Sequence, residues 1–320
     1  MIKPRILAVS FLLILFTLTS NGAKSSICFT FDDLPVDTHS DKSVSFQRSV
    51  ITGLVHTCKQ YHIPAIGFVN EGKMYRKDKR MDSVQVALLQ SWLKAKLELG
   101  NHTFSHPDYN KTSCVNFGED ILNGEKITRP LMKKHHKKLQ YFRHPFLSIG
   151  DSQAKYDSLE QFLAAHKYIV APITIENDDW IFDDAYDSAF VKKDSVLMRQ
   201  IGQSYIEFTE KQIKYNEMLS VKVFRRNICQ ILLLHSNAIN RDYLPQLAQM
   251  CKRNNYKFVS IEKSLRDKAY LSKITNFGDW GASWLIRWAM SMDIKGNLYA
   301  GLPVAPVFVL KLAGMPLDYR

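Results

Sequence analysis

The chain has 320 residues, of which 46% are hydrophobic and 23% charged, with no excess of glycine or proline. This length can bury one sizeable core, and the composition is that of a globular protein without repeats or low-complexity linkers. The formal net charge of +12 is spread along the chain and is not gathered in one tail. The densest basic run, residues 133–138, lacks interleaved aromatic residues. We therefore interpret it as a solvated helix face and expect no nucleic-acid partner.

The N-terminal segment differs from the rest of the chain. Lys3 and Arg5 precede an apolar run over residues 6–18, and small or polar residues follow at 20–23. This pattern predicts a secretory signal peptide over residues 1–23, and hence a secreted, periplasmic or cell-envelope protein. The apolar run is too short for a stable membrane span, so we expect none after cleavage; an uncleaved anchor is the alternative.

The five cysteines do not resemble a disulfide framework. They are few and odd in number, and most lie in apolar segments, as Cys28 and Cys229 do. We expect buried free thiols, with a single bridge left open as an alternative.

Short apolar runs alternate with segments of helical periodicity along most of the chain. Val44–Tyr61 and Asp151–His166 carry apolar residues at steps of three and four, which predicts helices. Strands separated by such helices predict a parallel sheet, either a (β/α) barrel or an open doubly wound sheet. The seven predicted strands are Ser26–Phe31, Pro64–Val69, Leu97–Asn101, Leu139–Arg143, Lys167–Thr174, Gln230–His235 and Lys257–Ser260.

Polar residues at the carboxyl ends of these strands favour the barrel. In a barrel all such ends meet at one rim, whereas an open sheet would distribute them along its edges. The residues concerned are Asp32, Asp33, His102, His106, Arg143, Asp178, Asp179 and His235.

Two of these groups suggest a metal site. Asp32 and Asp33 are adjacent, so one can bind a metal while the other stays free as a base. His102 and His106 are four residues apart, one helical turn, so both imidazoles can reach one ion. Two histidines and one carboxylate leave an open position for water, as catalytic zinc requires. Singly, each group has a structural explanation, such as a helix cap for the aspartates or a buried imidazole for His235. Their coincidence at one predicted rim favours the site.

The same residues carry a family resemblance. The sequence resembles the polysaccharide deacetylases of the NodB-homology type, carbohydrate esterase family four, from Ser26 to about Lys268. The resemblance implies a distorted (β/α) barrel of about seven parallel strands. It rests on five motifs that occur in order, namely Thr30–Asp33, His102–His106, Arg143–Phe146, Asp178–Trp180 and Leu233–Ser236.

The resemblance also implies roles for the metal side of the site. Asp33, His102 and His106 would hold one divalent metal ion, with zinc favoured and cobalt or manganese as alternatives. Asp32 would be the general base that deprotonates the attacking water. The backbone N–H of Phe146 would help to hold the oxyanion. Thr103 would brace the loop between the two histidines.

Further roles follow for the opposite side. His235 would be the general acid that protonates the leaving amine, and Asp179 rather than Asp178 would orient it. Arg143 would keep Asp32 ionised by its opposite charge. Trp180 and Leu233 would form the apolar slot for the acetyl methyl group.

The C-terminal part lies outside the family core. We divide the chain into a signal peptide (1–23), a NodB-like domain (24–268) and a tryptophan-rich extension (269–320). The extension is expected to pack on the barrel; a lid that presents Trp284 and Trp288 to substrate is the alternative. The remaining histidines, including His135 and His136, are expected to be surface residues.

The predicted activity is metal-dependent hydrolysis of N-acetyl groups from an amino-sugar polymer or oligosaccharide. An O-acetyl esterase or a cyclic-amide hydrolase would use the same site, because loops and groove shape choose the substrate. A non-haem iron oxygenase also uses two histidines and a carboxylate, but it needs neither Asp32 nor His235. A non-catalytic carbohydrate-binding protein is the third hypothesis, and the acid–base pair argues against it.

Overall fold

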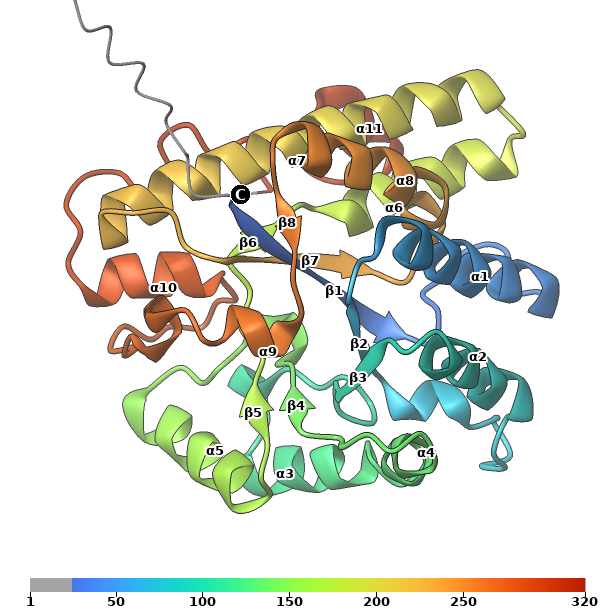
Figure 1. Ribbon diagram of the computed structural model, residues 1–320, viewed down its shortest axis with the longest axis horizontal. Helices are drawn as coiled ribbons and strands as arrows, with labels where there is room; N and C mark the ends of the chain where they lie inside the picture. Colours follow the sequence, from blue (N-terminus) through green and yellow to red (C-terminus); the bar gives the residue numbers. More distant parts are fainter. Residues whose placement is uncertain (1–24, 320) are drawn as a thin grey trace, which may run out of the picture.

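A computed structural model describes residues 25–319 as a curled parallel sheet surrounded by helices (Figure 1). The predicted signal peptide lies outside the described residues. The strands are β1 (Ser26–Leu34), β2 (Ile66–Val69), β3 (Glu98–Asn101), β4 (Tyr141–Phe142), β5 (Ile169–Val170), β6 (Ile175–Glu176), β7 (Gln230–His235) and β8 (Lys257–Phe258).

Helices connect most of these strands and cover the outside of the sheet (Figure 1). Within residues 25–319, none is both long and apolar enough to cross a bilayer. The α-helices are α1 (Val44–Tyr61), α2 (Ser83–Lys94), α3 (Cys114–Asn123), α4 (Thr128–Lys134), α5 (Gln153–Ala165), α6 (Asp179–Val191), α7 (Ser195–Phe224), α8 (Ala238–Arg253), α9 (Ile261–Ser264), α10 (Trp284–Ser291) and α11 (Val307–Leu312). Short 3₁₀ helices are η1 (Glu71–Met74), η2 (Tyr109–Lys111), η3 (Pro145–Leu147) and η4 (Lys268–Leu271).

The strand order is that of a barrel opened at one place. It runs β5-β4-β3-β2-β1-β7-β6, with β8 paired to β1, so the described sheet is open between β5 and β6. All strand pairings are parallel. The prediction of a distorted (β/α) barrel is therefore confirmed, and the carboxyl ends of the strands meet at one rim.

The predicted strand Lys167–Thr174 is wrong in its extent. Only β5 lies within it, and β6 follows as a separate strand that pairs with β7. The chain between them crosses the opening, so the carbonyls of Ala171 and Ile173 find other donors. Arg143 Nε lies 2.7 Å from the Ala171 oxygen, and the Trp284 N–H donates to the Ile173 oxygen at 2.8 Å.

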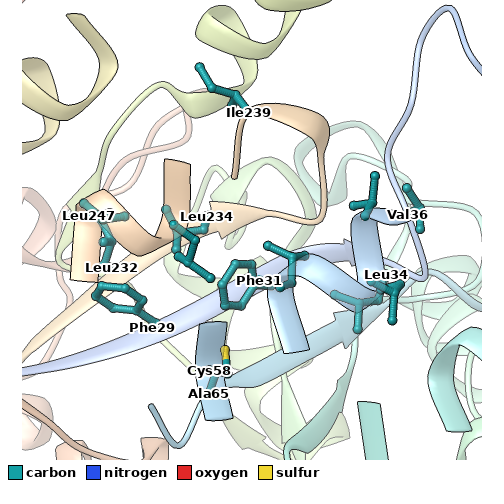
Figure 2. Close-up of a cluster of buried hydrophobic side chains, with 14 of the residues drawn as sticks. Phe29, Phe31, Leu34, Val36, Cys58, Ala65, Leu232, Leu234, Ile239 and Leu247 are labelled. Atoms are coloured by element: carbon teal, nitrogen blue, oxygen red, sulfur yellow. The ribbon is translucent and has the colours of Figure 1, made fainter. Parts of the chain in front are cut away.

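The core lies between β1, β7 and the helices outside them. Phe29, Phe31 and Leu34 of β1 are fully buried. Figure 2 shows Phe29 and Phe31 beside Leu232 and Leu234 of β7, and Leu34 near Val36. Strands covered on both faces read as continuous apolar runs, as β1 and β7 do.

Helix α1 forms where its periodicity predicts. It buries the face that carries Val50, Ile51, Leu54 and Cys58, and the Ser43 side chain caps its first turn by accepting from the Phe46 N–H.

The extension packs on the barrel, and the lid alternative is wrong. Trp284 and Trp288 of α10 are only 6% and 1% exposed. Trp288 packs edge-on against Phe224 of α7 and Tyr270 of η4, with ring centroids 5.6 and 5.4 Å apart. Neither indole is available to substrate.

Two smaller expectations need correction. His144 is buried, so the remaining histidines are not all surface residues. The basic run 133–138 is not one helix face either, because α4 ends at Lys134. All five cysteines are free, as expected; Cys28, Cys58 and Cys251 are buried, and Cys114 and Cys229 are half-buried.

Candidate metal centre and active site

The candidate metal centre lies where β1 and β3 end. Asp33 stands at an irregularity in the β1–β2 pairing and has a left-handed backbone, with φ of 63°. Its Oδ1 atom is 3.7 Å from Nε2 of both His102 and His106. One ligand atom from each of the three residues lies within 4.8 Å of the other two. The structure therefore brings together the three residues that the sequence singled out as metal ligands.

The two histidines meet for a different reason from the one expected. Residues 102–106 do not form a helical turn; Thr103 and His106 both have left-handed backbones. The Thr103 hydroxyl accepts from the His106 N–H at 3.0 Å, and this bond closes the loop. The spacing of four residues brings the imidazoles together through a tight turn, which periodicity alone does not reveal.

The protonation states of these groups fit a divalent cation. Burial would raise the pKa of Asp33, but Lys73, His102 and His106 hold it below its ordinary value. For His102 and His106, burial disfavours the charged form and so lowers the pKa. Both imidazoles are therefore neutral and can donate lone pairs to a metal.

The orientation of these groups fits a cation as well. His102 Nδ1 lies 2.8 Å from the Arg143 carbonyl oxygen, which turns Nε2 toward the centre. Asp33 Oδ1 is buried and has no hydrogen-bond partner within residues 25–319. A cation between the three ligand atoms would satisfy it.

Asp32 stands beside this centre and is 3% exposed. Its Oδ2 atom is 3.4 Å from Arg143 Nη1 and 3.8 Å from His102 Nε2. Burial raises the pKa of Asp32 to about 6, and the Arg143 charge opposes this shift only in part. The Arg143 charge therefore acts in the expected direction, since it lowers the pKa of Asp32, although desolvation is the larger effect.

Arg143 is held by several parts of the barrel. Its Nη2 donates to the Thr30 hydroxyl at 3.0 Å, its Nε to the Ala171 carbonyl, and its guanidinium lies 4.6 Å above the Phe68 ring. The side chain is fully buried. This fixed position is what sets the distance to Asp32.

His235 faces the same centre from the end of β7, where its Cα is the register partner of Asp32. His235 Nδ1 lies 2.7 Å from Asp179 Oδ1, and the His235 N–H donates to Asp179 Oδ2 at 2.6 Å. Burial disfavours the imidazolium, but Asp179 outweighs it and, with Asp33 and Asp32, raises the pKa of His235 to about 10. The partner of His235 is Asp179. Asp178 instead accepts from the Tyr319 hydroxyl at 2.7 Å.

The three predicted substrate contacts lie around the rim. Phe146 has a left-handed backbone, and its ring, 58% exposed, packs edge-on against His106 with centroids 4.5 Å apart. Trp180 lies in the first turn of α6 and is 37% exposed. Leu233 is buried in β7, two residues before His235. The Phe146 side chain is therefore both exposed and in contact with a candidate metal ligand.

Two polar residues near the site were missed from the sequence. Lys73 of η1 donates to the Asp33 carbonyl at 3.0 Å and forms a 3.4 Å ion pair with Asp37. Asn240 of α8 donates to Asp179 Oδ2 at 2.5 Å and to the His235 carbonyl at 2.9 Å. Neither follows a strand directly, so only the fold could reveal them.

Comparisons with known proteins agree with this architecture. Residues 19–160 match the polysaccharide deacetylase family. No curated protein matches the chain. A carbohydrate esterase family four pseudoenzyme from Bacillus anthracis is 14% identical, with a TM-score of 0.51 over 76% of this chain and 66% of that one. A mutant of it with restored enzymatic activity is 15% identical, with a TM-score of 0.51 over 76% and 68%. A family 4 carbohydrate esterase from Streptomyces lividans in complex with acetate is 15% identical, with a TM-score of 0.46 over 75% and 95%. At these identities, what the first two structures share with this chain is the fold.

Proposed function

We propose that this protein, whose residues 19–160 match the polysaccharide deacetylase family, removes acetyl groups from an N-acetylated carbohydrate with the help of one divalent metal ion. One observation carries the proposal. Asp32, with a pKa near 6, and His235, with a pKa near 10, flank the same three-ligand group. Two titratable groups whose surroundings drive their pKa values apart are suited to act as base and acid.

The proposed metal ligands are Asp33, His102 and His106. When bound there, a divalent cation would supply Lewis-acid activation of a water molecule and of the acetyl carbonyl. A carboxylate and two neutral imidazoles suit zinc, and cobalt or manganese are alternatives that the donor set also accepts.

The protein's own groups would carry the protons. Asp32, ionised near neutral pH, would accept a proton from the attacking water as its oxygen bonds to the acetyl carbon. The Phe146 N–H would donate to the carbonyl oxygen as that oxygen gains negative charge. His235, protonated at its Nε2 because Nδ1 is bonded to Asp179, would give a proton to the nitrogen as the C–N bond breaks. The products are acetate and a free amine.

The proposed substrate is an N-acetylated amino sugar within a polymer or oligosaccharide. The exposed Phe146 ring packs against the candidate ligand His106, and the exposed Trp180 directly follows Asp179, the partner of His235. These rings offer apolar surface that suits the faces of sugar rings and the acetyl methyl. An O-acetyl ester or a cyclic amide would present the same carbonyl and is a variant of this proposal. Export, inferred from the N-terminal sequence pattern, would bring the protein to cell-envelope polysaccharides.

The test is an acetate-release screen over chitin oligomers, peptidoglycan fragments and acetylated xylan, with metal content measured on the same sample. We expect release that a chelator abolishes. We also expect Asp32→Asn to lose activity with its metal retained, while the exposed control Glu119→Gln keeps wild-type activity. Sugar binding without acetate release at full metal occupancy would overturn the proposal in favour of a binding protein.

A further inference from the structure

The loop after β4 carries two consecutive non-glycine residues in the left-handed region. Phe146 has φ of 55° and Leu147 has φ of 54°. L-residues with side chains rarely adopt this conformation, and two in succession persist only when the surroundings hold them. Within the loop itself, the Leu147 N–H bonds to the His144 carbonyl and the Ser148 N–H to the Pro145 carbonyl, both at 3.1 Å.

The C-terminal extension covers the carbonyls of both left-handed residues. Arg287 Nη2 in α10 donates to the Leu147 oxygen at 2.9 Å. Gly281 lies so close to the Phe146 oxygen that a Cβ atom there would be 2.0 Å from it. Only glycine allows this approach of one backbone to the other.

The Arg287 side chain is fixed for this task. It is fully buried, donates to the Trp280 and Ala282 carbonyls at 3.0 and 3.3 Å, and lies 4.5 Å from the centre of the Trp280 ring. A buried guanidinium bonded to several carbonyls has little freedom to move. The Leu147 carbonyl is thereby tied to the start of α10, far along the chain from the barrel loop.

We propose that the C-terminal extension is a positioning part of the active site, in which Arg287 and Gly281 hold the left-handed Phe146–Leu147 turn and so aim the Phe146 N–H and ring at the candidate metal centre. The inference rests on the proposed function for its catalytic meaning. Gly281 and Arg287, which lie outside residues 19–160 that match the family, are then required for chemistry as well as for packing.

The variants are made in the full-length chain with metal content measured. Gly281 is exposed, so Gly281→Ala displaces the Phe146 carbonyl without opening the core. Arg287→Leu removes the bond to Leu147, and Arg287→Lys keeps a charge that can restore one bond. Asp279→Ala removes an exposed side chain two residues before Gly281 and is the matched control.

We expect Gly281→Ala and Arg287→Leu to lower kcat by about 10- to 100-fold, because misplacing a group that acts in the transition state costs this much. KM and metal content should stay within twofold of wild type, Arg287→Lys should recover part of the loss, and Asp279→Ala should match wild type. Unchanged kcat in Gly281→Ala would overturn the inference, and so would a loss of metal equal to the loss of kcat. If Arg287→Leu does not fold, Gly281→Ala still decides.

A second measurement separates this inference from the proposed function. If the wild type releases no acetate, the proposed function fails, but amide hydrogen exchange at Leu147 and Ser148 still reports on the turn. Faster exchange in Gly281→Ala, with unchanged exchange in α1, would support the positioning role. Unchanged exchange at both amides would overturn it.

Discussion

The two sides of the site use the same residue types at different distances. On the β1 side, the Asp33 carboxylate stands 3.7 Å from two imidazoles, and no hydrogen bond joins them. On the β7 side, Asp179 is bonded to His235 at 2.7 Å and also to its backbone N–H. The first arrangement leaves room for an ion between its members, whereas the second is already complete. Spacing, not composition, distinguishes the candidate metal centre from the proposed acid and its hydrogen-bonded partner.

The strongest way to break this comparison is to remove a ligand from the β1 side. His102→Ala should lose bound metal, because Asp33 and His106 alone leave one of the three protein ligands missing. Acetate release should then fall to background. Metal analysis and an acetate assay check this together. His56→Ala, an exposed histidine of α1, is the control. Full metal content in His102→Ala would mean that the ion binds elsewhere.

A change on the β7 side should leave the metal in place. His235→Gln is expected to lower kcat by about 100- to 1000-fold on an N-acetyl substrate, since an amine leaving group needs a proton. The loss of kcat should be smaller on an O-acetyl substrate, because an alkoxide leaves more readily than an amide anion and depends less on protonation. Equal losses on both substrates, measured side by side, would contradict the acid role.

The pairing of His235 with Asp179 gives a pH prediction. A general acid works while protonated, so activity should decline as pH rises toward the His235 pKa of about 10. Asp179→Asn removes the main stabilising charge, so the pKa falls and the high-pH limb moves to lower pH, with about a 10- to 100-fold loss of kcat at neutrality. Asp178→Asn should leave the limb in place. A pH–rate profile that moves with Asp178→Asn would reverse the assignment.

The smallest expected effect concerns Lys73, which supports the β1 side from outside. Lys73→Met should weaken metal binding by about 10-fold, because the bond from the lysine to the Asp33 carbonyl holds the left-handed backbone that places the Asp33 carboxylate. Titrating the metal-free protein with zinc measures the dissociation constant directly and does not depend on enzymatic activity. Lys77→Met, an exposed neighbour, is the matched control. Equal affinity in the two variants would remove Lys73 from the site.

The sequence predicted the barrel and the residues at its rim well, for a physical reason. Buried parallel strands are continuous apolar runs, so a polar residue at the end of such a run is conspicuous, as Asp33 and His235 are. Because the carboxyl ends of all strands meet at one rim, residues that end different strands in the sequence lie close together in the fold. The same logic cannot find Lys73 or Asn240, which approach the rim from helices.

Other features depend on tertiary contacts that no local pattern encodes. The His102–His106 turn forms through left-handed residues, and the pKa of Asp32 reflects how deeply the barrel buries it. Trp284 and Trp288 lie one helical turn apart, which would allow both to face substrate, yet both are buried. In each case the outcome is decided by what packs on the segment and not by the segment itself.

The bond from Arg143 to Ala171 has a practical consequence for mutagenesis. The Arg143 guanidinium both pairs with Asp32, the proposed base, and bonds to the chain that crosses the opening between β5 and β6. Its loss would therefore change the charge around Asp32 and the barrel structure together. Breaking a buried ion pair costs about 3 to 5 kcal/mol. An inactive Arg143 variant therefore says nothing about Asp32 until the variant's free energy of unfolding is known. A loss of activity measured without that control would overstate the contribution of Arg143 to catalysis.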